Sequence, residues 1–220
     1  MFGLGDKNKK LLTAYANNVL ADDVLTEDEE KALMQYASSL GVPTLDRYPD
    51  ILNRLMIGRV NDGRLPVLTN AQLICKTGEI VHLEANAQML KEVAIRRWTS
   101  SGFSVPIGYG VRYRVGGGQL RQVGTQIDVE DTGILSVTNT RVVFAGQRKI
   151  QEDLYAKLAS IHVFKDAISI GVTNRQNVGM YKLLNTTGEV VAAVINGAMH
   201  HEAPGAKTTP AAPPPNGSQP

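Results

Sequence analysis

The sequence predicts an α+β protein, with an N-terminal helical module followed by a small β-barrel that a C-terminal helix closes. Three observations predict this fold. Apolar residues recur at helical spacing as far as residue 60, short runs then alternate apolar and polar residues, and a helical pattern returns after residue 187. We therefore expect a helical module at 1–64, a barrel domain at 65–202 and a disordered Pro-rich tail at 203–220.

Three helices are predicted in the helical module. Helical spacing indicates the first, through Leu11, Leu12, Tyr15, Ala16, Val19 and Leu20. The second follows Thr26, which forms the capping-box pattern with Glu29, and it ends at Gly41. Its apolar positions, expected to face a partner helix, are Leu33, Met34, Tyr36, Ala37 and Leu40. The third helix covers 45–57, with Pro49 in its early part.

Short alternating runs predict the strands of the barrel. They lie at 80–84, 109–115, 127–129, 161–164, 168–172 and 178–184. The stretch 89–98 is ambiguous and is also compatible with a short helix. The terminal helix begins near Gly188, and its apolar stripe consists of Val190, Val191, Val194, Ile195 and Met199. Closure removes exposed strand edges, and the helix covers the open mouth.

The clearest strand signal is a hairpin at 131–146. Strand-forming side chains flank the polar turn 138–140, and these are Ile134, Val137, Val142 and Phe144. Asn139 can accept a positive φ in this turn, because asparagine tolerates that conformation better than most residues.

One run of this hairpin, Gly-x-Leu-x-Val-Thr-Asn-x-Arg-Val-Val-Phe at 133–144, resembles the central hairpin of GRAM and bacterial pleckstrin-homology-like domains. The resemblance covers about 79–199. Its other parts are Lys76–His82, the pattern Leu-x-x-Ile-x-Val-Phe-x-Asp-x-Ile-x-Ile at 158–170, and Met180–Leu183. It implies a small pleckstrin-homology/GRAM-like binding barrel and not an enzyme.

The acidic helix start at 21–30, followed by Ala32-Leu33 and Leu40-Gly41, resembles tellurite-resistance-B-like helical domains. Members of both families are mostly described as binding or stress-associated modules. The two resemblances therefore imply binding without a reaction.

Composition excludes several classes of protein. The net charge is +2, from 23 basic and 21 acidic residues in 220, which is too balanced to indicate nucleic-acid binding. The single cysteine, Cys75, excludes an internal disulfide and is expected to be buried. No apolar run reaches the length of a signal peptide core or a membrane span. We expect a cytoplasmic protein whose membrane contact, if any, is peripheral.

Two charged groups are candidate sites. The acids Asp22, Asp23, Glu27 and Asp28 could hold a divalent cation, or they could simply favour the positive end of a helix dipole. The basic residues Arg112, Arg114, Arg148 and Lys149 could grip a phosphate or lipid headgroup, or they could form a solvated strand face. Arg112 and Arg114 are two apart, so they share one face of a strand.

Trp98, the only tryptophan, is a candidate anchor for a protein partner, with a packing role as the alternative. The sequence shows no grouping of nucleophile, base and acid at a familiar spacing, and we expect neither catalysis nor a cofactor. The favoured function is binding of a protein partner. The alternatives are binding to anionic lipid headgroups and a metal-responsive stress role.

Overall fold

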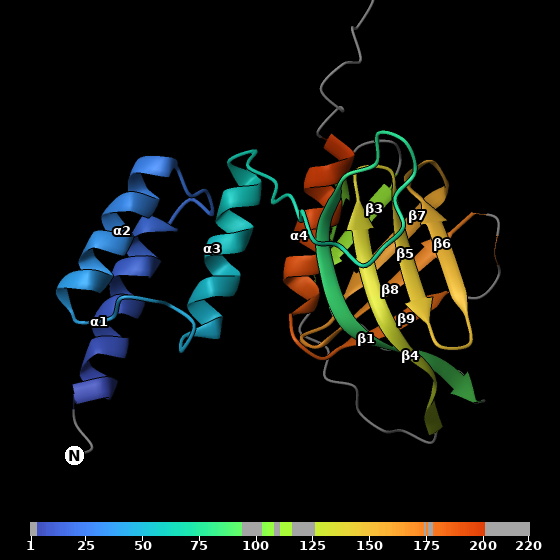
Figure 1. Cartoon of the computed structure of the whole chain (residues 1–220), viewed down its shortest axis with the longest axis horizontal. Coiled ribbons are helices and arrows are strands. Elements are labelled where there is room, and N and C mark those ends of the chain that lie inside the picture. The colour runs from blue at the N-terminus through green and yellow to red at the C-terminus, as the bar shows by residue number, and fades with distance from the viewer. Residues whose placement is uncertain are drawn as a thin grey trace, which may run out of the picture.

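The computed structural model describes residues 4–93, 103–107, 111–115, 126–173, 175 and 178–200. These residues form four α-helices and a nine-stranded sheet, so the α+β class is confirmed. The three N-terminal helices lie to one side of the sheet, and the C-terminal helix lies between them and the sheet (Figure 1). The predicted tail, 203–220, lies outside the described residues.

The helical module consists of α1 (Leu4–Val19), α2 (Glu27–Ser39) and α3 (Pro49–Asn61). The third helix begins later than predicted, because Pro49 takes the first helical position, where a missing N–H costs nothing. The prediction that Met34 faces a partner helix is wrong. Its side chain is 40% exposed, whereas nine other residues of the module form a buried core: Leu12, Ala16, Leu20, Leu25, Leu33, Ala37, Leu45, Ile51 and Leu55.

Nine strands follow: β1 (Val81–Val93), β2 (Phe103–Ile107), β3 (Val111–Val115), β4 (Gln126–Thr138), β5 (Arg141–Gly146), β6 (Ile150–Leu154), β7 (Leu158–Val163), β8 (Ala167–Val172) and β9 (Gly179–Leu183). A short 3-10 turn at Tyr155–Lys157 joins β6 to β7, and α4 (Gly188–His200) ends the described chain. The order across the sheet is β2-β3-β7-β8-β9-β1-β4-β5-β6. All neighbours are antiparallel except β3 and β7, which run parallel.

The central hairpin forms as predicted, with Val137 opposite Val142 in the β4–β5 pair. In its turn Asn139 keeps a negative φ, so the tolerance of asparagine for a positive φ is not used. The hydroxyl of Thr138 accepts the backbone N–H groups of Thr140 and Arg141, both at 3.1 Å, and so stabilises the turn.

The strand predictions need correction in three places, the first of which is β2 at Phe103–Ile107, a strand that was not predicted. Residues 89–93 belong to β1, so a helix there is wrong, while 94–98 lie outside the described residues. β6 was not predicted, because its sequence, Ile-Gln-Glu-Asp-Leu, carries its apolar residues on the exposed face and polar residues on the other.

The sheet curls until its last strand, β6, touches the middle of the sheet at β9. Gln151 on β6 donates a hydrogen bond to the hydroxyl of Tyr181 on β9, although these strands stand four places apart in the sheet. Arg175 contacts the carboxylate of Asp153 on β6 at 2.8 Å. No strand pairing among the described residues joins the two ends, β2 and β6. A hydrogen-bonded closed barrel is therefore a prediction that the structure does not show.

α4 packs on the curled sheet and joins it to the helical module. Val191, Val194 and Ile195 are fully buried in the sheet core, and the helix contacts β1, β4, β7 and β8. On its other side α4 meets α3, where Gly197 lies so close to Val60 that an added Cβ would stand 2.6 Å from Val60 Cγ1. The two modules thus share a direct packing contact.

The segment between the modules, residues 65–80, lies along the outer face of β1. The backbone N–H groups of Gln72 and Leu73 donate to the carboxylate of Glu84, each at 3.0 Å. The imidazole Nδ1 of His82 is 2.7 Å from the carbonyl oxygen of Pro66. These contacts fix the path by which the chain passes from α3 into the sheet.

Candidate functional site

The start of α2 is shaped by a capping box. The hydroxyl of Thr26 accepts the N–H of Glu29, and the Glu29 carboxylate accepts the N–H of Thr26 at 2.9 Å. This reciprocal cap places four acidic residues in the first turn, where the helix dipole favours negative charge. The predicted cap is thereby confirmed.

Glu30, the last of these acids, is held between two arginines. Arg64 donates to one of its oxygens at 2.8 Å, and Arg59 donates to the other. Arg64 also contacts Asp62 at 2.7 Å and the backbone carbonyl of Leu25. Burial acts to raise the pKa of Glu30, but the hydrogen bonds from the two arginines outweigh it, and the pKa falls below its usual range.

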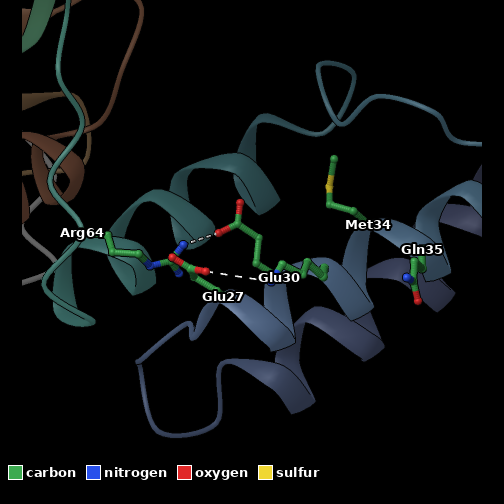
Figure 2. A pocket seen from close by; sticks show the side chains of 6 residues that line it. Glu27, Glu30, Met34, Gln35 and Arg64 are labelled. Carbon is green, nitrogen blue, oxygen red and sulfur yellow. Dashed lines mark hydrogen bonds and ion pairs between the residues drawn. The ribbon is translucent and has the colours of Figure 1, made fainter.

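A hollow of about 410 Å³ opens beside this cluster, on the surface of α2. Its lining consists of Glu27, Glu30, Lys31, Met34, Gln35 and Arg64. Figure 2 shows Arg64 reaching from the end of α3 to Glu30, with Met34 and Gln35 further along α2. The hollow therefore combines an exposed, flexible apolar side chain with a fixed charged wall, a combination suited to recognising another surface.

The surroundings of the hollow are acidic, but they do not form a metal centre. Asp22 accepts the N–H of Val24 in its own turn, and both Glu27 and Asp28 lie within 4 Å of Lys31. In the part of the chain that the structure describes, no three His, Cys, Asp or Glu side chains converge as a metal site would require. Asp22, Asp23, Glu27 and Asp28 are thus not brought together as ligands.

The second ionic cluster lies under the central hairpin. Arg141 binds Glu79 through two hydrogen bonds of 2.6 and 2.8 Å, and it also reaches Glu152 at 2.6 Å. The side chains of Arg141 and Glu79 are only 3% and 2% exposed. Hydrogen bonding from Arg141 lowers the pKa of Glu79 to about 2, against the opposing effect of burial. Both groups therefore stay charged at neutral pH and hold the hairpin to the preceding segment.

The turn between β5 and β6 contains Arg148 and Lys149, two of the predicted anion-binding residues. Their backbone N–H groups both donate to the carboxylate of Asp131 at 2.8 Å. The side chain of Lys149 pairs with Glu130, whereas the side chain of Arg148 is exposed. The carboxylate of Asp131 thus fixes the turn, and Lys149 already has an acidic partner.

The other predicted site residues lie elsewhere. Arg112 and Arg114 are in β3, where they pair with Ser160 and His162 of β7, and nothing is described of their side chains. Trp98 lies outside the described residues. The expectation that Cys75 is buried is wrong, because this thiol is exposed in the segment before β1. The predicted basic residues are therefore not assembled into one described patch.

Sequence reasoning did not identify the hollow. Arg64 and Glu30 are 34 residues apart, so no local pattern could show that they meet. The only available signal was Met34, an apolar residue beside several charged ones.

Comparison of this chain with protein-family models, curated proteins and solved structures finds no match.

Proposed function

We propose that this protein is a non-catalytic binding module that recognises a protein partner, and that the hollow on α2 takes part in this recognition. The observation that carries the proposal is the exposed Met34 beside a fixed ionic cluster. Methionine adapts its shape to a partner, while the Arg64–Glu30 pair gives the wall a defined charge pattern.

Charge indicates the kind of partner. Within the lining, Glu27 and Glu30 are balanced by Lys31 and Arg64, and the excess of acids lies beside it, at Asp22, Asp23, Asp28 and Glu29. Such an arrangement favours a partner segment with a basic residue next to an apolar one, because the acids attract the former and Met34 contacts the latter.

The curled sheet supports the same class of function. A curled antiparallel sheet covered by a terminal helix fits the GRAM or pleckstrin-homology-like barrel that the sequence resembles, and such a barrel serves binding. In this proposal the protein is an adaptor, because one chain offers two binding surfaces, one on the sheet and one on the helical module.

Binding to anionic lipid is the second candidate. The exposed Arg148 side chain favours it, but Lys149 is paired with Glu130 and the net charge is only +2. A metal-responsive stress role has less support, since Glu27, Asp28 and Glu30 pair with lysine or arginine and Glu29 caps the start of α2.

The test compares the proteins captured from a lysate of the source organism by the wild type and by two variants. Met34→Asp places a charge in the hollow, and Leu11→Asp is the matched control, since Leu11 on α1 is 38% exposed. We expect a specific partner that Leu11→Asp retains and Met34→Asp loses, with both variants melting like the wild type. An identical set of captured proteins for both variants would reject the hollow as the site.

A separate flotation assay with anionic liposomes distinguishes the lipid alternative. Salt-sensitive flotation that Arg148→Ala abolishes would favour lipid binding in place of protein binding.

A further inference from the structure

The outer edge of β6 has no strand partner in the part of the chain that the structure describes. Among the described residues β6 pairs only with β5. The N–H of Gly146 donates to the carbonyl of Lys149 before the strand, and the N–H of Tyr155 donates to the carbonyl of Thr140 after it. Because antiparallel hydrogen bonds alternate along a strand, the backbone groups of residues 151 and 153 face β5, and those of 150, 152 and 154 face outward.

The side chains at this edge divide between two faces. Ile150 is 75% exposed and Leu154 is 38% exposed, whereas Gln151 and Asp153 turn toward Tyr181 and Arg175 on the inner side. Two apolar side chains therefore flank Glu152 on the solvent-exposed side of the strand. They lie next to the backbone groups of the unpaired edge. A partner strand could use the backbone and the apolar contacts together.

We propose that β6 pairs antiparallel with β6 of a second copy of this chain, about a twofold axis at Glu152. In this register Ile150 of each copy lies opposite Leu154 of the other, so both exposed apolar side chains gain a partner. The outward N–H and carbonyl groups of residues 150, 152 and 154 all meet their counterparts, because the pair at the axis is of the hydrogen-bonded kind. The strand is thus complementary to itself.

The register also places the two Glu152 side chains opposite each other, which by itself would oppose pairing. The surroundings offset this charge. Glu152 is held by Arg141 at 2.6 Å and by Lys76 at 3.1 Å, and with Glu79 these residues carry two positive and two negative charges. Hydrogen bonds from Arg141 and Lys76 lower the pKa of Glu152, so the carboxylate stays ionised within a neutral cluster.

The oligomeric state tests this proposal. Sedimentation velocity over a hundredfold range of concentration should show the full-length protein passing from monomer to dimer. Changing Ile150 and Leu154 together to lysine should raise the dissociation constant at least about tenfold, because two apolar pairs are lost and charge is added. Leu184→Lys is the matched control, since Leu184 is 53% exposed, and it should leave dimerisation unchanged.

Two further variants identify the strand itself. Ile150→Pro removes the isoleucine side chain and an N–H that faces away from β5, at the first residue of the strand, where proline is tolerated. It should therefore block the dimer while the protein melts as before. Glu152→Gln leaves each cluster with a net charge of +1 near the axis, so it should weaken the dimer.

The natural Cys75 locates the interface, because it is exposed and adjoins Lys76, which contacts Glu152 near the axis. A spin label at Cys75 should give a single short distance between copies that Ile150→Pro eliminates. A protein that stays monomeric throughout, or a dimer that survives Ile150→Pro, would overturn the proposal.

Discussion

The two hydrophobic cores of this protein differ in how the sequence assembles them. The helical core joins residues between Leu12 and Leu55, mostly by contacts between neighbouring helices. The sheet core runs from Val60 to Ile195 and brings together strands from distant parts of the chain. Local contacts form quickly and leave a readable period in the sequence, whereas distant pairings must overcome the entropy of long loops.

Each core also has an ionic cluster at its side, and the two clusters differ in burial. The side chain of Glu30 is 21% exposed, whereas that of Glu79 is 2% exposed. Partial exposure lets water support the charges of the first cluster. The charges of the second cluster can be balanced only by one another. Removing one of these residues should therefore lower the free energy of unfolding by more than the same change in the first cluster.

The largest effect is expected when a charge enters the sheet core. Ile195→Asp should cost about 5 kcal/mol or more and unfold the sheet, because Ile195 is fully buried and an unpaired carboxylate has no partner there. Hydrogen exchange read by mass spectrometry should show the loss of amide protection in the strands, while Leu33–Ala37 in α2 keep theirs. Ile74→Asp is the control, since Ile74 is 90% exposed. Equal loss of protection in both modules would show that the two cores unfold as one.

The buried ionic cluster should make stability depend on pH. The pKa of Glu79 falls from 4.5 to about 2 on folding, so its charge stabilises the fold above pH 4.5, and this contribution disappears as pH falls toward 2. Glu79→Gln should therefore cost roughly 2–4 kcal/mol at pH 7, with a difference from the wild type that shrinks in acid.

Urea unfolding at several pH values measures this difference, and Glu27→Gln, at an exposed pair, serves as the control. A constant difference across the whole pH range would show that the Glu79 carboxylate does not provide the stabilisation.

Stability should depend on the size of the side chain at position 197, where α3 and α4 touch. Gly197→Val should cost about 1–3 kcal/mol, because its Cβ would stand 2.6 Å from Val60 Cγ1 and 2.9 Å from Leu65 Cδ2. Adding Val60→Ala should recover part of the loss, as a double-mutant cycle of unfolding free energies would measure. Strict additivity would mean that α3 and α4 do not couple the modules.

The smallest effect is expected at the cap of α2. Thr26→Ala should lower the free energy of unfolding by about 1 kcal/mol, because the N–H of Glu29 loses its acceptor and the reciprocal bond from the Thr26 N–H to the Glu29 side chain is no longer held in place. Thr26→Ser keeps the hydroxyl and should be nearly neutral. Thermal unfolding of both variants measures this. A cost as large as that of Gly197→Val would mean that the cap also supports the contact between the modules.

Much of the fold was predictable where the determining contacts are local. Thr26 and Glu29 are three residues apart, and Val137 and Val142 face each other across one turn, so the sequence pattern itself contains these interactions. β6 was missed because its inward-facing residues are polar. Gln151 is accommodated by a hydroxyl acceptor on Tyr181, 30 residues further on, and by the carboxylate of Asp153 on the same strand.

The candidate site was less predictable for the same reason. The sequence around Arg141 does not indicate that this residue is buried in an ion pair with Glu79, which lies 62 residues earlier. The hollow likewise depends on a contact between Glu30 and Arg64 across two helices. Charge patterns along the chain indicate which residues can pair, but the choice of partner is made by the tertiary fold.

The packing of Gly197 against Val60 has a consequence for assembly. Because α3 and α4 touch directly, the hollow on α2 and the edge of β6 belong to a continuously packed molecule. A twofold dimer through β6 would then carry two hollows at a set separation. Two linked copies of a ligand segment would bind such a dimer with an avidity governed by effective concentration, and a linker too short to span the hollows would lose the gain entirely.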